Sequence, residues 1–396
     1  MAVSIAASKK VVYGTSRVSF ALDSASDRIV FRLWPNMPVQ RKVGARLDVG
    51  QVRVDGAAVT VTEPDPTTLM LARPVGAGER VTVSMSWRLR LPRTPTERLA
   101  SRVGVRLGSF FPLLAWSGSG WALDPPAPQL ETWTSPVADF DVKIAAPKGM
   151  SVFASGANRG HGRWHAAAVR DFALEAGRFR VARRIVHVPS PVVVTVAAAS
   201  KSTYLPTYLN AAARALTTFS QRYGAYPWPT YTVVVEADRL TLGDEYPTLV
   251  FISTDFGANV VTHETAHQWF YSLVGDNQAR DPWLDETLAE WATARFFGHV
   301  ATDAATDIPA EVRNHLGEPM TFWGPLPFMP TVWAGLYIQG VKALASFGED
   351  DTVDCALQRY VHDNAYRTAV PRDLLAALTP TLPNAEATLT SFGARF

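Results

Sequence analysis

The first 200 residues alternate apolar and polar side chains, with turn residues at short intervals. A period of two places alternate side chains on one face of a strand, so these segments predict half-buried β-strands. Asp55-Gly56 lies between two such runs and predicts a hairpin turn. The expected strands are 17–22, 28–34, 52–63, 80–91, 135–147 and 192–200, and the proline- and glycine-rich stretch 91–128 predicts long loops. An antiparallel β domain over residues 1–200 follows.

The hydrophobic period changes after residue 200. Apolar residues at helical spacing predict a helix that begins at Pro206 and ends before Gly224: Leu209, Ala212, Ala213, Leu216, Phe219 and Tyr223. Short strands are expected at 230–237 and 248–253, and helices joined by loops from Asn259 onward. The chain is therefore expected to have a multi-domain α+β fold, with a mostly helical second domain over 201–396.

Length and composition support two folded units and exclude several classes of function. A chain of 396 residues exceeds what one hydrophobic core usually holds, and 47% hydrophobic residues with 12 tryptophans supply a large interior. The formal charge of +2 and the absence of a Lys/Arg run argue against a nucleic-acid partner. A single cysteine, Cys355, excludes an intrachain disulfide and a thiolate metal site, so any metal must use His, Asp or Glu.

Neither a membrane span nor a signal peptide is expected. The longest strongly apolar run, 192–199, is far shorter than the ~20 residues that cross a bilayer. The first ten residues, MAVSIAASKK, have neither a basic n-region nor a full apolar h-region. The sequence does not decide whether the protein is cytoplasmic or, if a leader was removed, secreted or at the cell surface. It does not give the oligomeric state either.

The stretch VVTHETAHQWF places two histidines around a glutamate. His263 and His267 are four residues apart, so on a helix their rings lie about 40° apart on one face and both can reach one ion. Glu264 lies between them, close enough to contact a metal-bound water. This is the H-E-x-x-H pattern of zinc peptidases, in which the glutamate is the general base.

A catalytic zinc needs a third protein ligand. The stretch DPWLDETLAEW predicts a second helix that opens at Asp281-Pro282 and carries three acids: Asp285, Glu286 and Glu290. Between His267 and Glu286 lie 18 residues, enough for the rest of one helix, a short loop and an antiparallel return. This spacing would bring a carboxylate back beside the histidine pair.

These motifs resemble the gluzincin metallopeptidases of the aminopeptidase N and leukotriene hydrolase family, whose signature is H-E-x-x-H followed after 18 residues by the glutamate of W-L-x-E. The resemblance implies that His263, His267 and Glu286 bind one zinc ion and that Glu264 is the base. It also implies a saddle-like β domain followed by a thermolysin-like catalytic domain. Longer family members continue into a large C-terminal helical domain, so a chain that ends at Phe396 is expected to be a short form with a more open cleft.

Glu290 lies on the same helical face as Glu286, four residues further on. It could accept the remaining N–H of His263, which fixes the tautomer of a ligating histidine. A solvated helix face or an ion pair with Arg295 is the alternative, and the sequence does not decide between these roles.

Upstream of the histidines, LGDEYP resembles the family's G-x-M-E-N element. The resemblance implies that Glu245 binds the free α-amine of a peptide, and Gly243 would let the backbone approach the substrate. Asp244 stands where methionine is usual. A second carboxylate there could strengthen cation binding, favour basic side chains or be an ordinary loop acid.

Downstream, Tyr337 and Gly340 match the family's Y-x-x-G element. The resemblance implies that the Tyr337 hydroxyl donates to the oxyanion that forms during hydrolysis. The function expected is a zinc-dependent aminopeptidase that releases N-terminal residues from peptides by attack of a zinc-bound water. An endopeptidase or epoxide hydrolase on the same scaffold, and a non-catalytic zinc-binding scaffold, are the alternatives.

Overall fold

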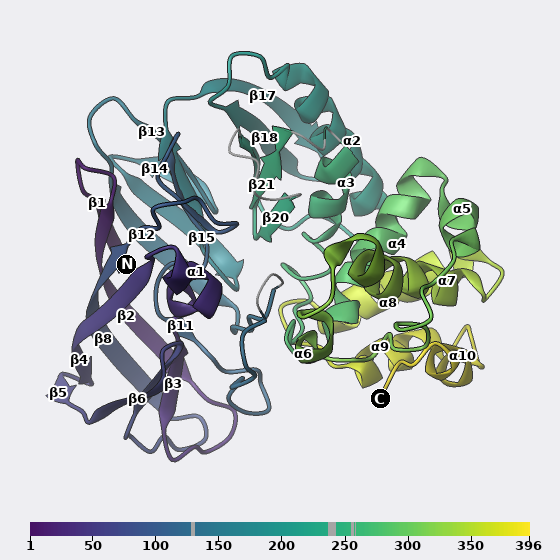
Figure 1. Cartoon of the computed structure of the whole chain (residues 1–396), viewed down its shortest axis with the longest axis horizontal. Coiled ribbons are helices and arrows are strands. Elements are labelled where there is room, and N and C mark those ends of the chain that lie inside the picture. The colour runs from purple at the N-terminus through teal and green to yellow at the C-terminus, as the bar shows by residue number, and fades with distance from the viewer. Residues whose placement is uncertain (128–130, 237–242, 255–256, 258) are drawn as a thin grey trace.

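The computed structural model describes residues 1–396 apart from 128–130, 237–242, 255–256 and 258. The first half of the chain forms β-sheets, and the second half is mainly helical beyond one further sheet (Figure 1). The predicted multi-domain α+β fold is thereby confirmed. Within the described residues, no helix is both long enough and apolar enough to cross a membrane.

An eight-stranded sheet dominates the β domain, and its longest strands pair antiparallel over their full lengths. Burial in β8 alternates strictly, because Val81, Val83 and Met85 point into the core while their neighbours face outward. The expected hairpin turn at Asp55-Gly56 is present, with both residues at positive φ. In order across the sheet the strands are β14 (Ala157–Gly160), β15 (Arg163–Val169), β12 (Ala138–Ala145), β1 (Ala2–Ile5), β2 (Val11–Ala21), β8 (Arg80–Arg90), β4 (Arg46–Val54) and β5 (Ala57–Ala58).

Two four-stranded sheets complete this half of the molecule. Their strands are β13 (Ser151–Ala154), β16 (Leu174–Gly177), β10 (Val105–Leu107) and β9 (Leu99–Ala100), then β11 (Leu113–Leu114), β3 (Ile29–Arg32), β7 (Thr68–Leu71) and β6 (Val61–Asp65). The expected loops over 91–128 are thus only partly correct, since β9, β10 and β11 lie there; residue 128 is outside the described residues. Strands of two or three fully buried residues carry no alternation from which to predict them.

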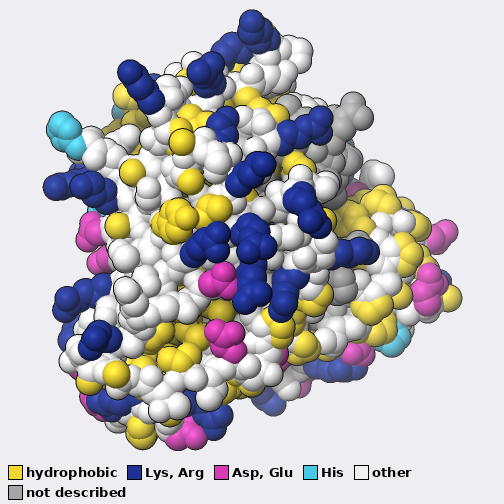
Figure 2. Space-filling view, turned by 60° about the vertical axis from the view of Figure 1, so that its left-hand side comes forward, with side chains coloured by type: hydrophobic (Ala, Val, Ile, Leu, Met, Phe, Trp, Pro, Cys, Tyr) yellow, Lys and Arg dark blue, Asp and Glu magenta, His cyan; other side chains and the backbone are white. Residues whose placement is uncertain are grey.

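The molecular surface on the β-domain side is rich in positive charge. Figure 2 shows many Lys and Arg side chains on this face and few acidic ones. The small net charge of +2 is therefore spread unevenly over the molecule.

A five-stranded sheet links the β half to the helices, and its order is β17 (Arg180–His187), β18 (Pro191–Ala198), β19 (Thr230–Glu236), β21 (Leu249–Ser253) and β20 (Gly243–Tyr246). The strands expected at 230–237 and 248–253 are present, with residue 237 outside the described residues. Since β17 and β18 precede the expected domain boundary at 200, we propose that the second unit begins near residue 178, between β16 and β17.

Helices pack against one another beyond this sheet (Figure 1). The predicted first helix is α2, and it ends before Gly224, which has a φ of 115°. One expected start is wrong: a 3-10 turn, Pro282–Leu284, precedes α4, whose N-cap is Asp285 rather than Asp281. The helices are α1 (Pro38–Lys42, in the β domain), α2 (Leu205–Tyr223), α3 (Asn259–Ala266), α4 (Glu286–Phe297), α5 (Val300–Ala305), α6 (Met320–Trp323), α7 (Gln339–Ala345), α8 (Asp350–Asn364), α9 (Pro371–Leu378) and α10 (Ala385–Ser391), with a π-helical segment, Phe328–Ile338, before α7.

Asp171, a buried acid of the β domain, gives a prediction about stability and pH. Burial raises the pKa of Asp171 from 3.8 to about 7, although its carboxylate accepts hydrogen bonds from Ser109 Oγ at 2.7 Å and from the Phe172 amide at 2.6 Å. The pKa of Asp171 is higher in the folded than in the unfolded protein. Its ionisation therefore lowers the free energy of unfolding as pH rises from about 4 to about 7.

The near-isosteric substitution Asp171→Asn should therefore gain stability relative to the wild type as pH rises, by ~3 kcal/mol between pH 4.5 and pH 8. Urea unfolding at both pH values measures the difference, and the exposed Asp307→Asn serves as the control. A constant difference across this range would show that Asp171 titrates as an ordinary surface acid.

Candidate metal centre and active site

The two motif histidines lie side by side at the C-terminal end of α3. The helix ends at Ala266, so His267 occupies the turn that follows, but its amide still bonds to the His263 carbonyl at 3.3 Å. The ring centroids are 4.8 Å apart, and the two Nε2 atoms are 3.1 Å apart. Both Nε2 atoms thus face one point in front of the helix end.

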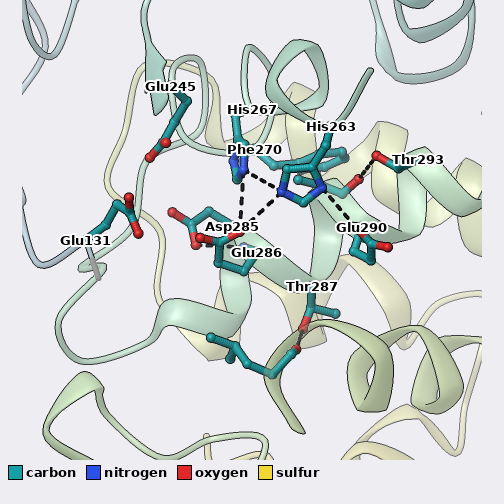
Figure 3. A network of polar contacts seen from close by, with 12 residues as sticks. Glu131, Glu245, His263, His267, Phe270, Asp285, Glu286, Thr287, Glu290 and Thr293 are labelled. Carbon is teal, nitrogen blue, oxygen red and sulfur yellow. Dashed lines mark hydrogen bonds and ion pairs between the residues drawn. The ribbon is translucent and has the colours of Figure 1, made fainter. Parts of the chain in front are cut away.

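Glu286, the first residue of α4, completes a three-atom donor set (Figure 3). Its Oε2 lies 3.4 Å from His263 Nε2 and 3.5 Å from His267 Nε2. A tetrahedral zinc with bonds of about 2.0–2.1 Å separates its ligand atoms by roughly 3.3–3.4 Å. The donor chemistry and the separations of these three residues therefore fit a zinc ion.

Each histidine has an acceptor on its other ring nitrogen. His263 Nδ1 lies 2.9 Å from Glu290 Oε2, and His267 Nδ1 lies 3.0 Å from the Phe270 carbonyl oxygen. A proton on each Nδ1 leaves both Nε2 lone pairs directed at the metal position. Glu290 therefore contacts His263 and not Arg295. Arg295 pairs instead with three acids of α8: Asp350, Asp351 and Asp354.

Glu264 projects from α3 next to this donor set. Carboxylate oxygens of Glu264 and Glu245 and a ring nitrogen of His267 all lie within 4.8 Å of one another. Burial raises the pKa of Glu264 to about 7, although the neighbouring histidines oppose the shift. A carboxyl group with this pKa can take up and return a proton near neutral pH.

Gly243 has a different neighbour from the one expected. A Cβ at this position would lie 2.1 Å from Glu264 Oε1, so the glycine leaves room for the candidate base. That Gly243 lets the backbone approach the substrate stays a prediction.

Tyr337 reaches the site from the π-helical segment. Its ring lies 5.8 Å from the His263 ring, centroid to centroid, and burial together with the Glu286 carboxylate raises the pKa of the phenol well above its usual range. The hydroxyl therefore stays protonated and can donate a hydrogen bond. Gly340 permits this placement, because a Cβ there would lie 2.1 Å from the Thr287 side chain on α4.

Two carboxylates face the space beside the metal position (Figure 3). Glu245, on β20, accepts a hydrogen bond from Gln278 Nε2 at 3.0 Å. Glu131, from the β domain, points toward Glu245, and burial and the Glu245 charge raise the pKa of Glu131 well above its usual range. Glu131 and Gln278 were not predicted, since neither belongs to a sequence motif; an acid in a loop of the β domain was the only available signal for Glu131.

The fold and the site together have the arrangement of a gluzincin-type metallopeptidase, with the first motif histidine on one helix, the second in the turn after it and the third donor at the start of the next helix. Residues 207–318 match the model of the Peptidase family M1 domain, so the chain carries an M1 peptidase domain and is a hydrolase of the zinc metallopeptidase class. This match agrees with the family that the motifs predict. A comparison with curated protein sequences finds no significant match.

Solved structures show the same fold. An M1 zinc metallopeptidase from Deinococcus radiodurans superposes with a TM-score of 0.71 at 20% identity, covering 99% of this chain and 92% of the other. A two-domain M1 zinc metallopeptidase, as a glutamate-to-alanine mutant bound to L-arginine, gives 0.72 at 18% identity, covering 100% and 92%. A mutant of the Deinococcus radiodurans protein bound to a Tyr-Ser-Ala substrate gives 0.70 at 18% identity, covering 100% and 93%.

Proposed function

We propose that this protein is a zinc-dependent aminopeptidase that removes N-terminal residues from peptides. The observation that carries this proposal is the pair of buried carboxylates, Glu245 and Glu131, beside the three-residue donor set. A protonated α-amine placed between them would favour the ionised form of both carboxylates and bind to them in a site largely removed from water. An acceptor for the substrate's N-terminus one residue away from the metal limits cleavage to the first peptide bond.

His263, His267 and Glu286 would hold one zinc ion, with Glu290 fixing the orientation of the His263 ring. When bound, zinc supplies a Lewis acid that lowers the pKa of a water molecule and stabilises negative charge on the scissile carbonyl oxygen.

Glu264 would accept the proton of the attacking water as the new carbon–oxygen bond forms. It would return this proton to the amide nitrogen as the carbon–nitrogen bond breaks, so that a free amine leaves. Tyr337 would donate its hydroxyl hydrogen bond to the carbonyl oxygen while that oxygen carries negative charge.

The test compares a peptide with a free N-terminus, Tyr-Ser-Ala, with its N-acetylated twin. Acetylation removes the charge that Glu245 and Glu131 would bind, so kcat/KM should fall on the order of a hundredfold. The zinc content of the purified protein is measured on the same sample, and the expected result is one ion per chain.

The other outcomes separate the alternatives. Equal rates on both peptides would refute the amine anchor and indicate an endopeptidase. Bound zinc without hydrolysis of any peptide would favour a non-catalytic scaffold, and hydrolysis of an epoxide alone would favour an epoxide hydrolase.

A further inference from the structure

Arg98 links the β domain to the substrate side of the site. It is 3% exposed, its Nη2 donates to Glu131 Oε1 at 2.5 Å, and its Nη1 donates to the Tyr246 hydroxyl at 2.7 Å and forms an ion pair with Asp244. The guanidinium carbon lies 3.8 Å from the centre of the Trp133 ring. Stacking and a forked set of donors together fix the plane of this group.

Asp244 does not share a face with its neighbour Glu245. Successive side chains of a strand point to opposite faces, so Asp244 and Tyr246 lie together on one face of β20 and Gly243 and Glu245 on the other. Arg98 contacts both residues of the first face, while Glu245 and Gly243 adjoin Glu264. Asp244 is fully buried. Asp244 therefore points away from the face that carries Glu245, although its carboxylate comes within 4.8 Å of the Glu131 carboxylate.

We propose that Arg98 is the positioning residue for Glu131 and that Asp244 is the counter-charge that holds Arg98 in place. This inference rests on the proposed function, because it assigns Glu131 a role in binding the substrate amine. The residue that replaces the usual methionine thus acts on the substrate site indirectly, through Arg98.

The charge balance of the group favours this arrangement. Arg98 alone beside Glu131 would neutralise the carboxylate that the amine needs. The carboxylates of Glu131, Asp244 and Glu97 lie within 4.8 Å of one another, so acids outnumber Arg98 here. A substrate amine that favours the ionised form of Glu131 is therefore still attracted to it while its Oε1 is held in position.

The experiment measures binding rather than turnover. The parent is zinc-loaded Glu264→Gln protein, which should not cleave peptide, and the ligands are Tyr-Ser-Ala and its N-acetylated twin, titrated calorimetrically. The key variant is Arg98→Met with Asp244→Met, which removes two opposite charges together, so the net charge near the amine is unchanged. Apolar residues at both positions leave no unpaired charge at 98 or 244, and Glu131 alone loses its guanidinium partner, which is the intended effect.

This double substitution should weaken binding of the free-amine peptide by about tenfold, because Glu131 loses its orientation. In a background that also carries Glu131→Gln, the same double substitution should change affinity by less than about twofold, because the positioned group is already absent. The acetylated peptide should bind equally in all variants.

A second buried pair gives the matched control. Arg106 Nη1 lies 3.2 Å from Glu236 Oε2, joining the β domain to β19 without a contact to Glu131. Arg106→Met with Glu236→Met should leave the affinity for the free-amine peptide unchanged. If the Arg98 and Asp244 double variant does not fold, Arg98→Lys replaces the fork by one ammonium group and should weaken binding several-fold, again only when Glu131 is present.

Unchanged affinity in the Arg98 variants, or an equal loss with and without Glu131, would overturn the inference and leave the aminopeptidase proposal intact. If the Glu264→Gln parent binds the acetylated peptide as tightly as the free one, the amine anchor itself is wrong, and this inference falls with it.

Discussion

Glu264→Gln should lower kcat by roughly 10³- to 10⁴-fold while zinc remains bound, because the amide cannot take a proton from water. The side chain is 5% exposed and adjoins the donor set without belonging to it, so the metal site should persist. Steady-state hydrolysis of Tyr-Ser-Ala and metal analysis of the same preparation measure both quantities. The loss should appear in kcat, since Glu245 and Glu131, which would bind the amine, are unchanged.

Glu264→Asp is the matched variant, because it keeps a carboxylate but shortens its reach. It should recover part of the lost rate at an unchanged zinc content. Activity close to wild type in the glutamine variant would mean that another group is the base. Loss of zinc from it would mean that Glu264 contributes to the metal site itself.

The sequence predicts most of the metal centre because its information is local. Helical geometry sets the separation of His263 and His267, and the 18-residue spacing returns Glu286 to them. The expected continuation of the first helix beyond His267 is wrong, because α3 ends at Ala266 and turns lead to Glu286. The structure brings all three together, with Glu290 at His263. All three donors lie on two elements that are neighbours in the sequence, α3 with the turn after it and α4.

The substrate side is harder to predict because its groups come from both halves of the chain. Glu131 and Arg98 belong to the β domain and meet β20 only through tertiary packing. The strand period alone could have shown that Asp244 and Glu245 point in opposite directions. That inference requires LGDEYP to be recognised as a strand, whereas the sequence pattern is also compatible with an ordinary loop.

Tertiary contacts also override local signals elsewhere. Gly275 matches a helix C-cap by position, but α3 ends at Ala266, and a Cβ at Gly275 would lie 2.2 Å from the guanidinium of Arg170. The glycine is there for close packing. By contrast, Gly298 is the C-cap of α4, in the left-handed conformation that the pattern predicts.

Removal of the third donor should abolish the metal site. Glu286→Ala leaves two histidine nitrogens, one fewer protein ligand than a catalytic zinc takes, so the variant should lose its zinc on dialysis together with its activity. Zinc added back after chelation should restore the wild type and not this variant. Because zinc binds the folded state, the wild type should melt at a higher temperature with zinc than without it, and Glu286→Ala at one temperature in both conditions.

Glu290→Gln tests a group that would act on the zinc ion through His263, whereas Glu286 would bind the ion directly. Its side chain contacts His263 Nδ1 and no other atom of the donor set, so zinc should still bind, but roughly 10- to 100-fold more weakly. Competition with a chelator of known affinity measures both variants on one scale. A Glu290 variant as depleted of zinc as Glu286→Ala would show that Glu290 ligates the ion, and a Glu286 variant that keeps its zinc would assign the third donor to another acid, with Glu264 and Glu245 the nearest.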